Sequence, residues 1–243
     1  MKMSSNTILI TGATSGIGLG LAKAFLERGN EVIICGRREE LLNDIKQQYP
    51  AMHVRRCDVA VEAERVALFE WVTQTFPQLN VLINNAGIQR HIQMPPQEAW
   101  QETALEIEIN LQAPIHLTFL FAPHLEQQSN AALGMVSSGL AFVPNTGAPI
   151  YSATKAALHS FTVAARYSLR TKGIEVIEII PPAVETELGG VGRHAGTTPL
   201  SEFVDAVMRQ LEEQKPEVTY GFSAKASQAS RTEIEDILRR MNP

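Results

Sequence analysis

Thr11-Gly12-Ala13-Thr14-Ser15-Gly16-Ile17-Gly18 connects two segments of different hydrophobic periodicity near the start of this 243-residue chain. Residues 7–11 (TILIT) form a short β-branched run, typical of a buried parallel strand. Residues 19–26 place apolar side chains on one side of a helix, which Gly29 ends. Glycines at such a junction allow a tight turn, and the free N–H groups at a helix start bind pyrophosphate. We therefore predict a dinucleotide site that includes Gly12, Thr14, Ser15, Gly16, Ile17 and Gly18.

The glycine spacing in this turn is GxxxGxG, whereas the general dinucleotide fingerprint is GxGxxG. A simpler interpretation is that these glycines only form the turn. The strand pattern before them and the helix pattern after them favour the cofactor site over that interpretation.

Strand and helix patterns alternate along the rest of the chain. Strands are expected at residues 7–11, 31–35, 53–57, 81–84, 131–137 and 174–180, with a short seventh one at 217–222. Helices are expected at 38–49, 61–76, 97–126, 151–172, 200–213 and 232–241. This alternation predicts a mostly parallel sheet of six or seven strands with helices on both faces. No linker or repeat divides the series, so we predict one α/β domain, a Rossmann-type doubly wound fold, over residues 1–243.

The composition excludes several function classes. A net charge of −5 gives no electrostatic signal for nucleic acid or for an anionic membrane. No apolar run reaches the ~18 residues that span a bilayer, and the N-terminus lacks a secretion signal. We expect Cys35 and Cys57 to be reduced thiols in a cytoplasmic protein. The six histidines show no metal-binding spacing, so no metal is expected.

Two arginines follow the second predicted strand, where such folds meet the adenosine ribose. An acidic residue there binds a 2′-hydroxyl group, whereas an arginine accommodates a 2′-phosphate. The sequence here is Gly36-Arg37-Arg38, without a carboxylate before Glu39. Arg37 and Arg38 therefore predict a preference for NADP(H), with NAD(H) remaining an alternative. Arg38 also opens a predicted helix, and the competing interpretation is a solvated surface charge.

Tyr151 and Lys155 lie four residues apart in a predicted helix, which places their side chains on one face. A phenol normally ionises near pH ~10. An ammonium at about 4 Å, with an effective dielectric constant near 20, favours the phenolate by roughly 4 kcal/mol. This pair is therefore a candidate general acid–base, whose pKa we expect Lys155 to lower. The alternative is an ordinary exposed pair on a helix.

The glycine turn, Asn84-Asn85-Ala86-Gly87 and the Tyr151–Lys155 pair occur together and in this order. With them the chain resembles the short-chain dehydrogenase/reductase family over residues 5–187. Within that family it is most similar to DltE-like oxidoreductases, through stretches such as VIICGRRE and NVLINNAGIQ. The resemblance implies an NAD(P)-dependent enzyme that transfers a hydride to or from a carbonyl or secondary alcohol substrate.

The resemblance also implies roles for individual residues. Tyr151 resembles the general acid–base, and Lys155 the group that lowers its pKa and holds the nicotinamide ribose. Ser138 resembles the serine that hydrogen-bonds the substrate oxygen, and Asn110 the asparagine that anchors a proton-relay water. The remaining matches are cofactor contacts: Asp58, Val59, Asn85, Ala86, Gly87, Val184 and Thr186.

The chain departs from the family pattern after the sixth predicted strand. Pro182 occupies the position of a family glycine, and it lacks a backbone N–H group. Residues 187–199 are rich in glycine, carry Arg193 and His194, and are predicted to form a substrate lid. The loops around the expected cleft are mostly apolar with some cationic character. They fit a small ketone or aldehyde, and whether it carries an anion stays open.

Assembly and catalysis leave alternatives open. The unusual C-terminal part makes the tetramer common in the family less certain than a homodimer through the helices of residues 97–126 and 151–172. A cofactor-binding sensor or partner-binding protein is the alternative to an enzyme. Such a protein should lack part of the Asn110, Ser138, Tyr151 and Lys155 set, and this chain has all four.

Overall fold

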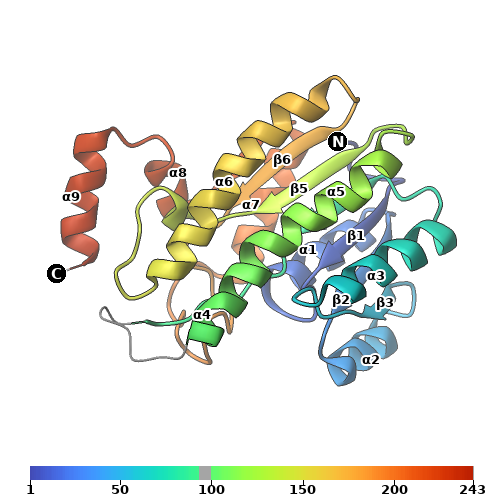
Figure 1. Cartoon of the computed structure of the whole chain (residues 1–243), viewed down its shortest axis with the longest axis horizontal. Helices are drawn as coiled ribbons and strands as arrows, with labels where there is room; N and C mark the ends of the chain where they lie inside the picture. The colour runs from blue at the N-terminus through green and yellow to red at the C-terminus, as the bar shows by residue number, and fades with distance from the viewer. Residues whose placement is uncertain (93–99, 243) are drawn as a thin grey trace.

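Seven parallel strands form one sheet in the order β3-β2-β1-β4-β5-β6-β7 in the computed structural model, which describes residues 1–92 and 100–242 (Figure 1). The strands are β1 (Thr7–Thr11), β2 (Glu31–Gly36), β3 (His53–Arg56), β4 (Val81–Asn84), β5 (Ala132–Val136), β6 (Glu175–Ile180) and β7 (Glu217–Thr219). Every pairing between neighbours is parallel. The predicted doubly wound α/β fold is confirmed.

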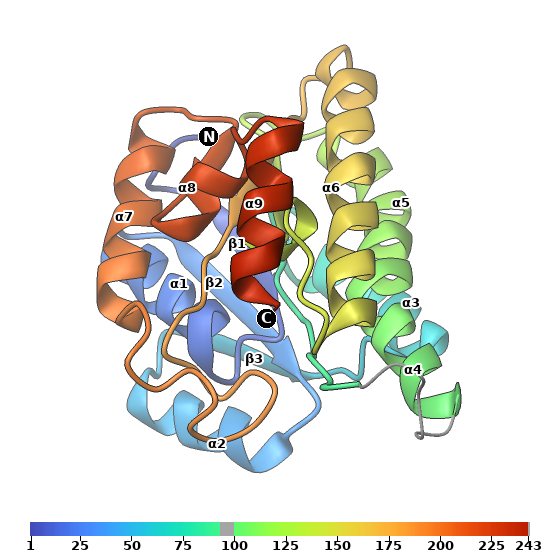
Figure 2. The same ribbon diagram turned by 90° about the vertical axis from the view of Figure 1, so that its left-hand side faces the viewer.

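Helices cover both faces of the sheet. They are α1 (Gly16–Glu27), α2 (Glu39–Gln48), α3 (Glu62–Thr75), α4 (Trp100–Ile107), α5 (Ala113–Leu125), α6 (Pro149–Arg170), α7 (Leu200–Glu212), α8 (Phe222–Ala226) and α9 (Arg231–Met241). Figure 2 shows α1, α2 and α7 on one side of the sheet and α3, α5 and α6 on the other. None of the helices in the described residues has both the length and the apolar character needed to cross a bilayer.

Alternate side chains of the central strands supply two hydrophobic cores. Ile8 and Ile10 of β1 pack with Phe25 of α1 and Phe203 of α7 on one face. Leu9, between them, packs on the other face with the core that contains residues of α3, α5 and α6. Successive strand residues point to opposite faces, so a strand buried on both faces is apolar at every position. The continuous apolar run that predicted β1 reflects this double burial.

Two predicted elements differ from the structure. The helix expected over residues 97–126 is interrupted by a π-helical turn, Glu108–Gln112, and residues 97–99 lie outside the described ranges. The strand expected over 217–222 ends at Thr219, because Gly221 takes a positive φ of 55° and α8 begins at Phe222. Pairing with β6 also ends at Thr219. The prediction missed α8, since five residues are too few for a helical periodicity to show.

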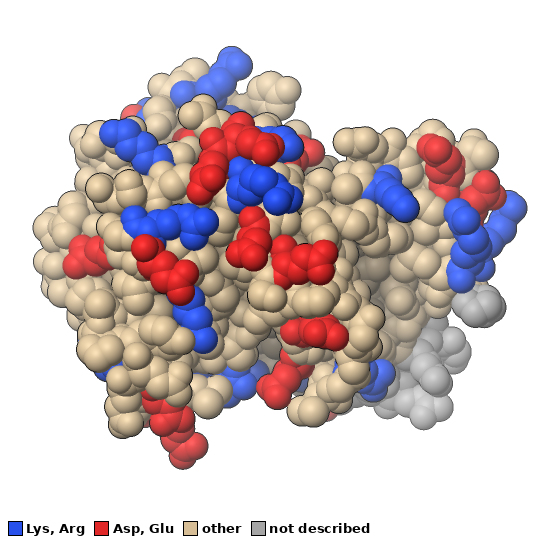
Figure 3. Space-filling view, turned by 180° about the vertical axis from the view of Figure 1, so that it is seen from behind, with Lys and Arg blue, Asp and Glu red and all other residues tan. Residues whose placement is uncertain are grey.

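Charges of both signs are interspersed on the face opposite to that of Figure 1 (Figure 3). Some are paired, as Arg28 of α1 is with Glu212 of α7 at 3.5 Å. Exposed pairs of this kind contribute little stability, roughly 0–1 kcal/mol each. The sheet and its two cores therefore determine where the functional side chains lie.

Candidate active site

A cavity of about 1160 Å³ opens at the carboxyl ends of β1, β4, β5 and β6. It lies where the strand order reverses direction between β1 and β4, the place at which open α/β sheets bind their ligands. Its wall contains residues of the glycine turn, of the segments after β4 and β5, of α6 and of the loop after β6. The segments predicted separately as cofactor site, catalytic helix and lid thus meet around one space.

The glycine turn is held tightly against the end of β4. A Cβ atom on Gly12, whose φ is +65°, would lie 2.5 Å from the Cα atom of Ala86. A Cβ on Gly18 would lie 2.4 Å from Nδ2 of Asn85. That amide donates hydrogen bonds to the carbonyls of Thr11 at 2.9 Å and Gly12 at 3.2 Å. Glycine is required at both positions by close approach, and Asn85 fastens the turn to β4.

The first turn of α1 is free to bind an anion. Ser15 precedes the helix without making a side-chain capping hydrogen bond, and the first turn contains no acidic residue. The N–H groups of such a turn and its partial positive charge favour a phosphate. Gly16 and Ile17 line the cavity at this point. The turn therefore fits the pyrophosphate of a dinucleotide.

Arg38 lies across the glycine turn. Its Nη2 donates to Oγ1 of Thr14 at 2.9 Å and to Oγ of Ser15 at 2.8 Å. Both Arg37 and Arg38 are exposed and line the cavity. A planar guanidinium beside the phosphate-binding turn is suited to a second phosphate group. This placement fits the 2′-phosphate of NADP(H).

Some predicted cofactor contacts lie behind the cavity wall. Asp58 lies in the turn before α3, where its Oδ1 accepts from the N–H group of Ala60 at 3.0 Å. Val59 is buried in the core next to it. Neither is part of the cavity wall, nor are Thr14 and Ala86, which lie directly behind Arg38 and Gly12. The contact of Asp58 with the adenine and the contact of Val59 with the cofactor stay predictions.

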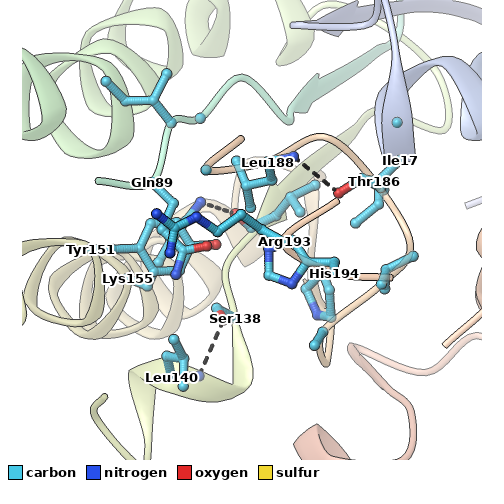
Figure 4. A pocket seen from close by; sticks show the side chains of 18 of the residues that line it. Ile17, Gln89, Ser138, Leu140, Tyr151, Lys155, Thr186, Leu188, Arg193 and His194 are labelled. Carbon is cyan, nitrogen blue, oxygen red and sulfur yellow. Dashed lines mark hydrogen bonds between the residues drawn. The ribbon is translucent and has the colours of Figure 1, made fainter. Parts of the chain in front are cut away.

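Ser138, Tyr151 and Lys155 converge on the cavity from β5 and α6 (Figure 4). Pro149 begins α6 and places Tyr151 in its first turn, where only 6% of the side chain is exposed. The hydroxyl of Ser138 lies near the phenol and favours its ionised form. The Nζ of Lys155 donates to the carbonyl of Val136 at 2.8 Å and lies 5.6 Å from the centroid of the Tyr151 ring. The pair predicted from its spacing and the serine implied by the family resemblance therefore lie on the same cavity wall.

The pKa of Tyr151 differs in direction from the prediction. Burial raises it to about 12, the hydrogen bond from Ser138 opposes the shift, and Glu106 adds to it. Burial also lowers the pKa of Lys155 from its ordinary 10.5 to about 8, against the charges of Glu178 and Glu106. At both groups the largest effect is the loss of hydration of the charged form. The ammonium of Lys155 bonds to the carbonyl of Val136 and lies over the ring of Tyr151. In this state the phenol is protonated and can donate its proton.

Asn110 lies in the π-helical turn between α4 and α5 and is fully buried. Its Oδ1 accepts from the N–H group of Ile88 at 2.9 Å, and its Nδ2 donates to the Ile88 carbonyl at 2.8 Å and to Thr154 Oγ1 at 3.3 Å. A Cβ on Gly87 would lie 3.3 Å from Oδ1 of Asn110 and 3.6 Å from Nζ of Lys155. Asn110 thus joins the end of β4 to α6 beside the lysine. Its predicted water contact remains a prediction.

Two buried carboxyl groups near Lys155 were missed by sequence reasoning. Glu106 is 0% exposed; its Oε1 accepts from the backbone N–H of Arg90 at 3.1 Å, while Oε2 has no partner among the described residues. Burial raises the pKa of Glu106. Glu178 of β6 is also fully buried and bonds to His159 of α6 at 2.9 Å. A glutamate inside the apolar run of β6 was the one signal available.

The loop after β6 lies over the cavity. Val184 forms an isolated bridge with Thr198, which closes the loop on itself. Thr186 contacts the glycine turn, because a Cβ on Gly16 would lie 3.3 Å from its Cγ2. Gly189 approaches Gln89 in the same way, at 3.5 Å. The segment thus reaches from the glycine turn to the residues after β4 and lines the cavity between them. Its role as a substrate lid stays a prediction.

Comparison with known proteins finds relatives that are dehydrogenases or oxidoreductases. A family model described as "short chain dehydrogenase" matches residues 6–195. The chain is 47% identical over 250 residues to the uncharacterized oxidoreductase DltE of Bacillus subtilis, covering 100% of this chain and 98% of that protein. It is 33% identical over 184 residues to a serine 3-dehydrogenase of Agrobacterium fabrum, covering 75% of this chain and 74% of that one.

Solved structures resemble the whole chain. A short chain dehydrogenase from Burkholderia cenocepacia in complex with NADP superposes with a TM-score of 0.85 at 27% identity, covering 98% of this chain and 99% of that one. One from Sphingobium yanoikuyae in complex with NADPH gives a TM-score of 0.80 at 25% identity, covering 97% and 94%.

Proposed function

Because this chain belongs to the short-chain dehydrogenase/reductase family and is an NAD(P)-dependent oxidoreductase, we propose that it uses NADP(H) to interconvert a carbonyl and a secondary alcohol, with Tyr151 as the general acid–base. The observation that carries the proposal is that Ser138, Tyr151 and Lys155 lie together on the wall of the cavity, with Nζ of Lys155 5.6 Å from the centroid of the Tyr151 ring. Both hydroxyl groups can donate to one substrate oxygen.

Each residue has a role that follows from its chemistry. When a carbonyl is reduced, negative charge develops on its oxygen, and donors aimed there stabilise the transition state. Ser138 and Tyr151 supply these donors, and Tyr151 gives its proton to the oxygen. Lys155, whose pKa of about 8 lies near neutrality, then returns a proton to Tyr151. The bound nicotinamide supplies or accepts the hydride.

The reverse reaction requires the phenolate of Tyr151, which takes the proton of the alcohol. With a pKa of about 12, nearly all of the phenol is protonated at neutral pH in the protein without cofactor, so little phenolate is available. A positive charge brought close to the ring favours the phenolate. Oxidation is therefore expected to accelerate as the pH rises toward the alkaline range, while reduction does not require this. The dependence of kcat on pH in each direction measures the difference.

The cofactor preference is tested by replacing Arg38 with alanine. One charge-assisted hydrogen bond is worth roughly 1.5–3 kcal/mol, which corresponds to a rise in the KM for NADPH of about 10- to 100-fold. The KM for NADH should change little, because NADH lacks the 2′-phosphate. Arg170→Ala at the exposed end of α6 is the matched control. A wild-type protein that prefers NADH would contradict the assignment.

A panel of ketones, aldehydes and secondary alcohols, followed by the ultraviolet absorbance of the reduced cofactor, tests the activity itself. Relatives named serine 3-dehydrogenase and sulfoacetaldehyde reductase, at 33% and 30% identity, support including hydroxy acids and small charged aldehydes. Turnover of any member is expected to require Tyr151. A protein that binds NADPH and turns over nothing across the panel would favour the sensor function instead.

We also propose a homodimer through α5 and α6. Phe119 on α5 and Tyr167 on α6 are 67% and 70% exposed, which is unusual for large aromatic side chains in a monomer. Phe119 lies near Phe161 of α6, with ring centroids 6.5 Å apart, so apolar side chains of both helices form one surface. Light scattering after size-exclusion chromatography should give twice the 26.7 kDa mass of the chain, and a monomer would disprove the proposal.

A further inference from the structure

Arg193, His194 and His91 form a cluster of basic side chains on the wall of the cavity. Arg193 and His194 belong to the loop after β6, and His91 to the segment after β4. The pKa of His91 is lowered by burial and then by the charges of Arg193 and His194. Groups about a hundred residues apart in sequence are therefore close enough to repel one another.

The cluster has no negative partner within the described part of the chain. The side chain of Arg193 takes part in no ion pair or hydrogen bond with a described residue, whereas Arg90, which lines the same cavity, is paired with Glu102. Nε2 of His194 is buried and has no partner there either. A buried polar atom without a partner is costly. Arg193 and His91 are exposed, so an anion between the three groups would neutralise the guanidinium and bond to Nε2 of His194.

The cluster lies on the side of the cavity where Tyr151 is found. The N–H group of Ile92, next to His91, donates to the carbonyl of Gly147 at 3.1 Å, two residues before α6, and Tyr151 is in the first turn of that helix. In the view of Figure 4 the Arg193 side chain extends from its loop across the cavity toward Tyr151 and Lys155. The glycine turn has its own arginine, Arg38, bonded to Thr14 and Ser15. The cofactor phosphates thus have a separate site.

We propose that this cluster binds an oxyanion carried by the substrate, of the carboxylate or sulfonate class, while Tyr151 and Ser138 bind its carbonyl or hydroxyl oxygen. The inference rests on the proposed oxidoreductase function. The forked guanidinium of Arg193 matches the two oxygens of such a group, and the imidazoles add hydrogen bonds. The substrate is then a small oxo acid or hydroxy acid.

The test compares an anionic substrate with its neutral counterpart in the Arg193→Met variant. With NADPH as cofactor, the KM for acetoacetate should rise about 10- to 100-fold, because a charge-assisted pair is lost. The KM for methyl acetoacetate and the KM for NADPH should each stay within about twofold of wild type. Arg193→Lys keeps the positive charge but loses the forked guanidinium. Its KM for acetoacetate should lie between those of wild type and Arg193→Met. Arg170→Met is the matched control, since that arginine is exposed and lies outside the cavity.

A second measurement does not depend on turnover. Calorimetry on the NADP-bound protein should detect malonate binding that Arg193→Met weakens at least tenfold, with malonamide binding unaffected by the change.

An equal rise in the KM for acetoacetate and for methyl acetoacetate, or a rise in the KM for NADPH of similar size, would overturn the inference. So would malonate binding that is the same in both proteins. If the ester is reduced equally well by both proteins while the acid shows no preference, the oxidoreductase function stands and only the oxyanion site is lost. A β-keto sulfonate of equal length decides which oxyanion binds more tightly.

Discussion

Replacing Tyr151 by phenylalanine is expected to lower kcat by about 10²- to 10⁴-fold, the range that a positioned general acid–base contributes. The change removes the hydroxyl group that we propose donates a proton to the substrate oxygen, and it leaves the ring in place. Ser138 keeps its hydrogen bond from the N–H group of Leu140 at 3.1 Å, so the site should not rearrange. Steady-state kinetics in the direction of carbonyl reduction measure the loss.

Cofactor binding separates this prediction from a general loss of structure. The dissociation constant of NADPH, measured by fluorescence, should stay within about threefold of wild type, since the phosphates bind elsewhere on the cavity wall. Tyr167→Phe is a matched control on the same helix, because Tyr167 is exposed and lies outside the cavity. A Tyr151→Phe protein with near-normal kcat would remove Tyr151 from the mechanism.

Replacing Lys155 by methionine is expected to separate activity from stability. Methionine preserves the length and the apolar part of the side chain, so the helix packing should remain. The loss of the ammonium should lower kcat by about 10²- to 10³-fold, as removal of a preorganised charged donor commonly does. The free energy of unfolding near pH 7 should change little. The variant no longer buries a charge, but the carbonyl of Val136 loses its donor, a cost of roughly 1–3 kcal/mol.

The pH dependence of that stability identifies the cause. Lys155 has a pKa of about 8 in the folded protein, and its ordinary pKa of 10.5 applies to the unfolded chain. Between pH 8 and 10.5 the unfolded chain therefore binds more protons than the folded protein. The free energy of unfolding contributed by Lys155 therefore rises with pH, by about 1.4 kcal/mol per unit. Between pH 8 and 10 wild type should gain roughly 2–3 kcal/mol relative to Lys155→Met. Urea unfolding of both proteins measures it, and a difference that is independent of pH would contradict the buried-charge interpretation.

The central elements could be predicted from sequence because their signals are local. β1 is apolar at every position, the glycine turn follows it directly, and α1 has helical periodicity. The Tyr151–Lys155 pair follows from one helix in the same way, since four residues make about one turn. The strand predicted over 217–222 was wrong at residues 220–222. The positive φ of Gly221 ends the extended backbone there, and a helix of five residues is too short to show a helical pattern in the sequence.

The chemistry of the site depended on contacts that no local pattern contains. The sequence alone determined the alternation of strands and helices, the glycine turn and the identity of the candidate catalytic residues. Only the tertiary structure placed Glu106 and Glu178 near Lys155, and left Arg193 without a carboxylate partner in the described residues. Burial raises the pKa of Tyr151, whereas its spacing from Lys155 in the sequence predicted a lowered pKa. The physical reason is that periodicity is set by the backbone of one element, whereas desolvation and charge are set by everything that packs around a group.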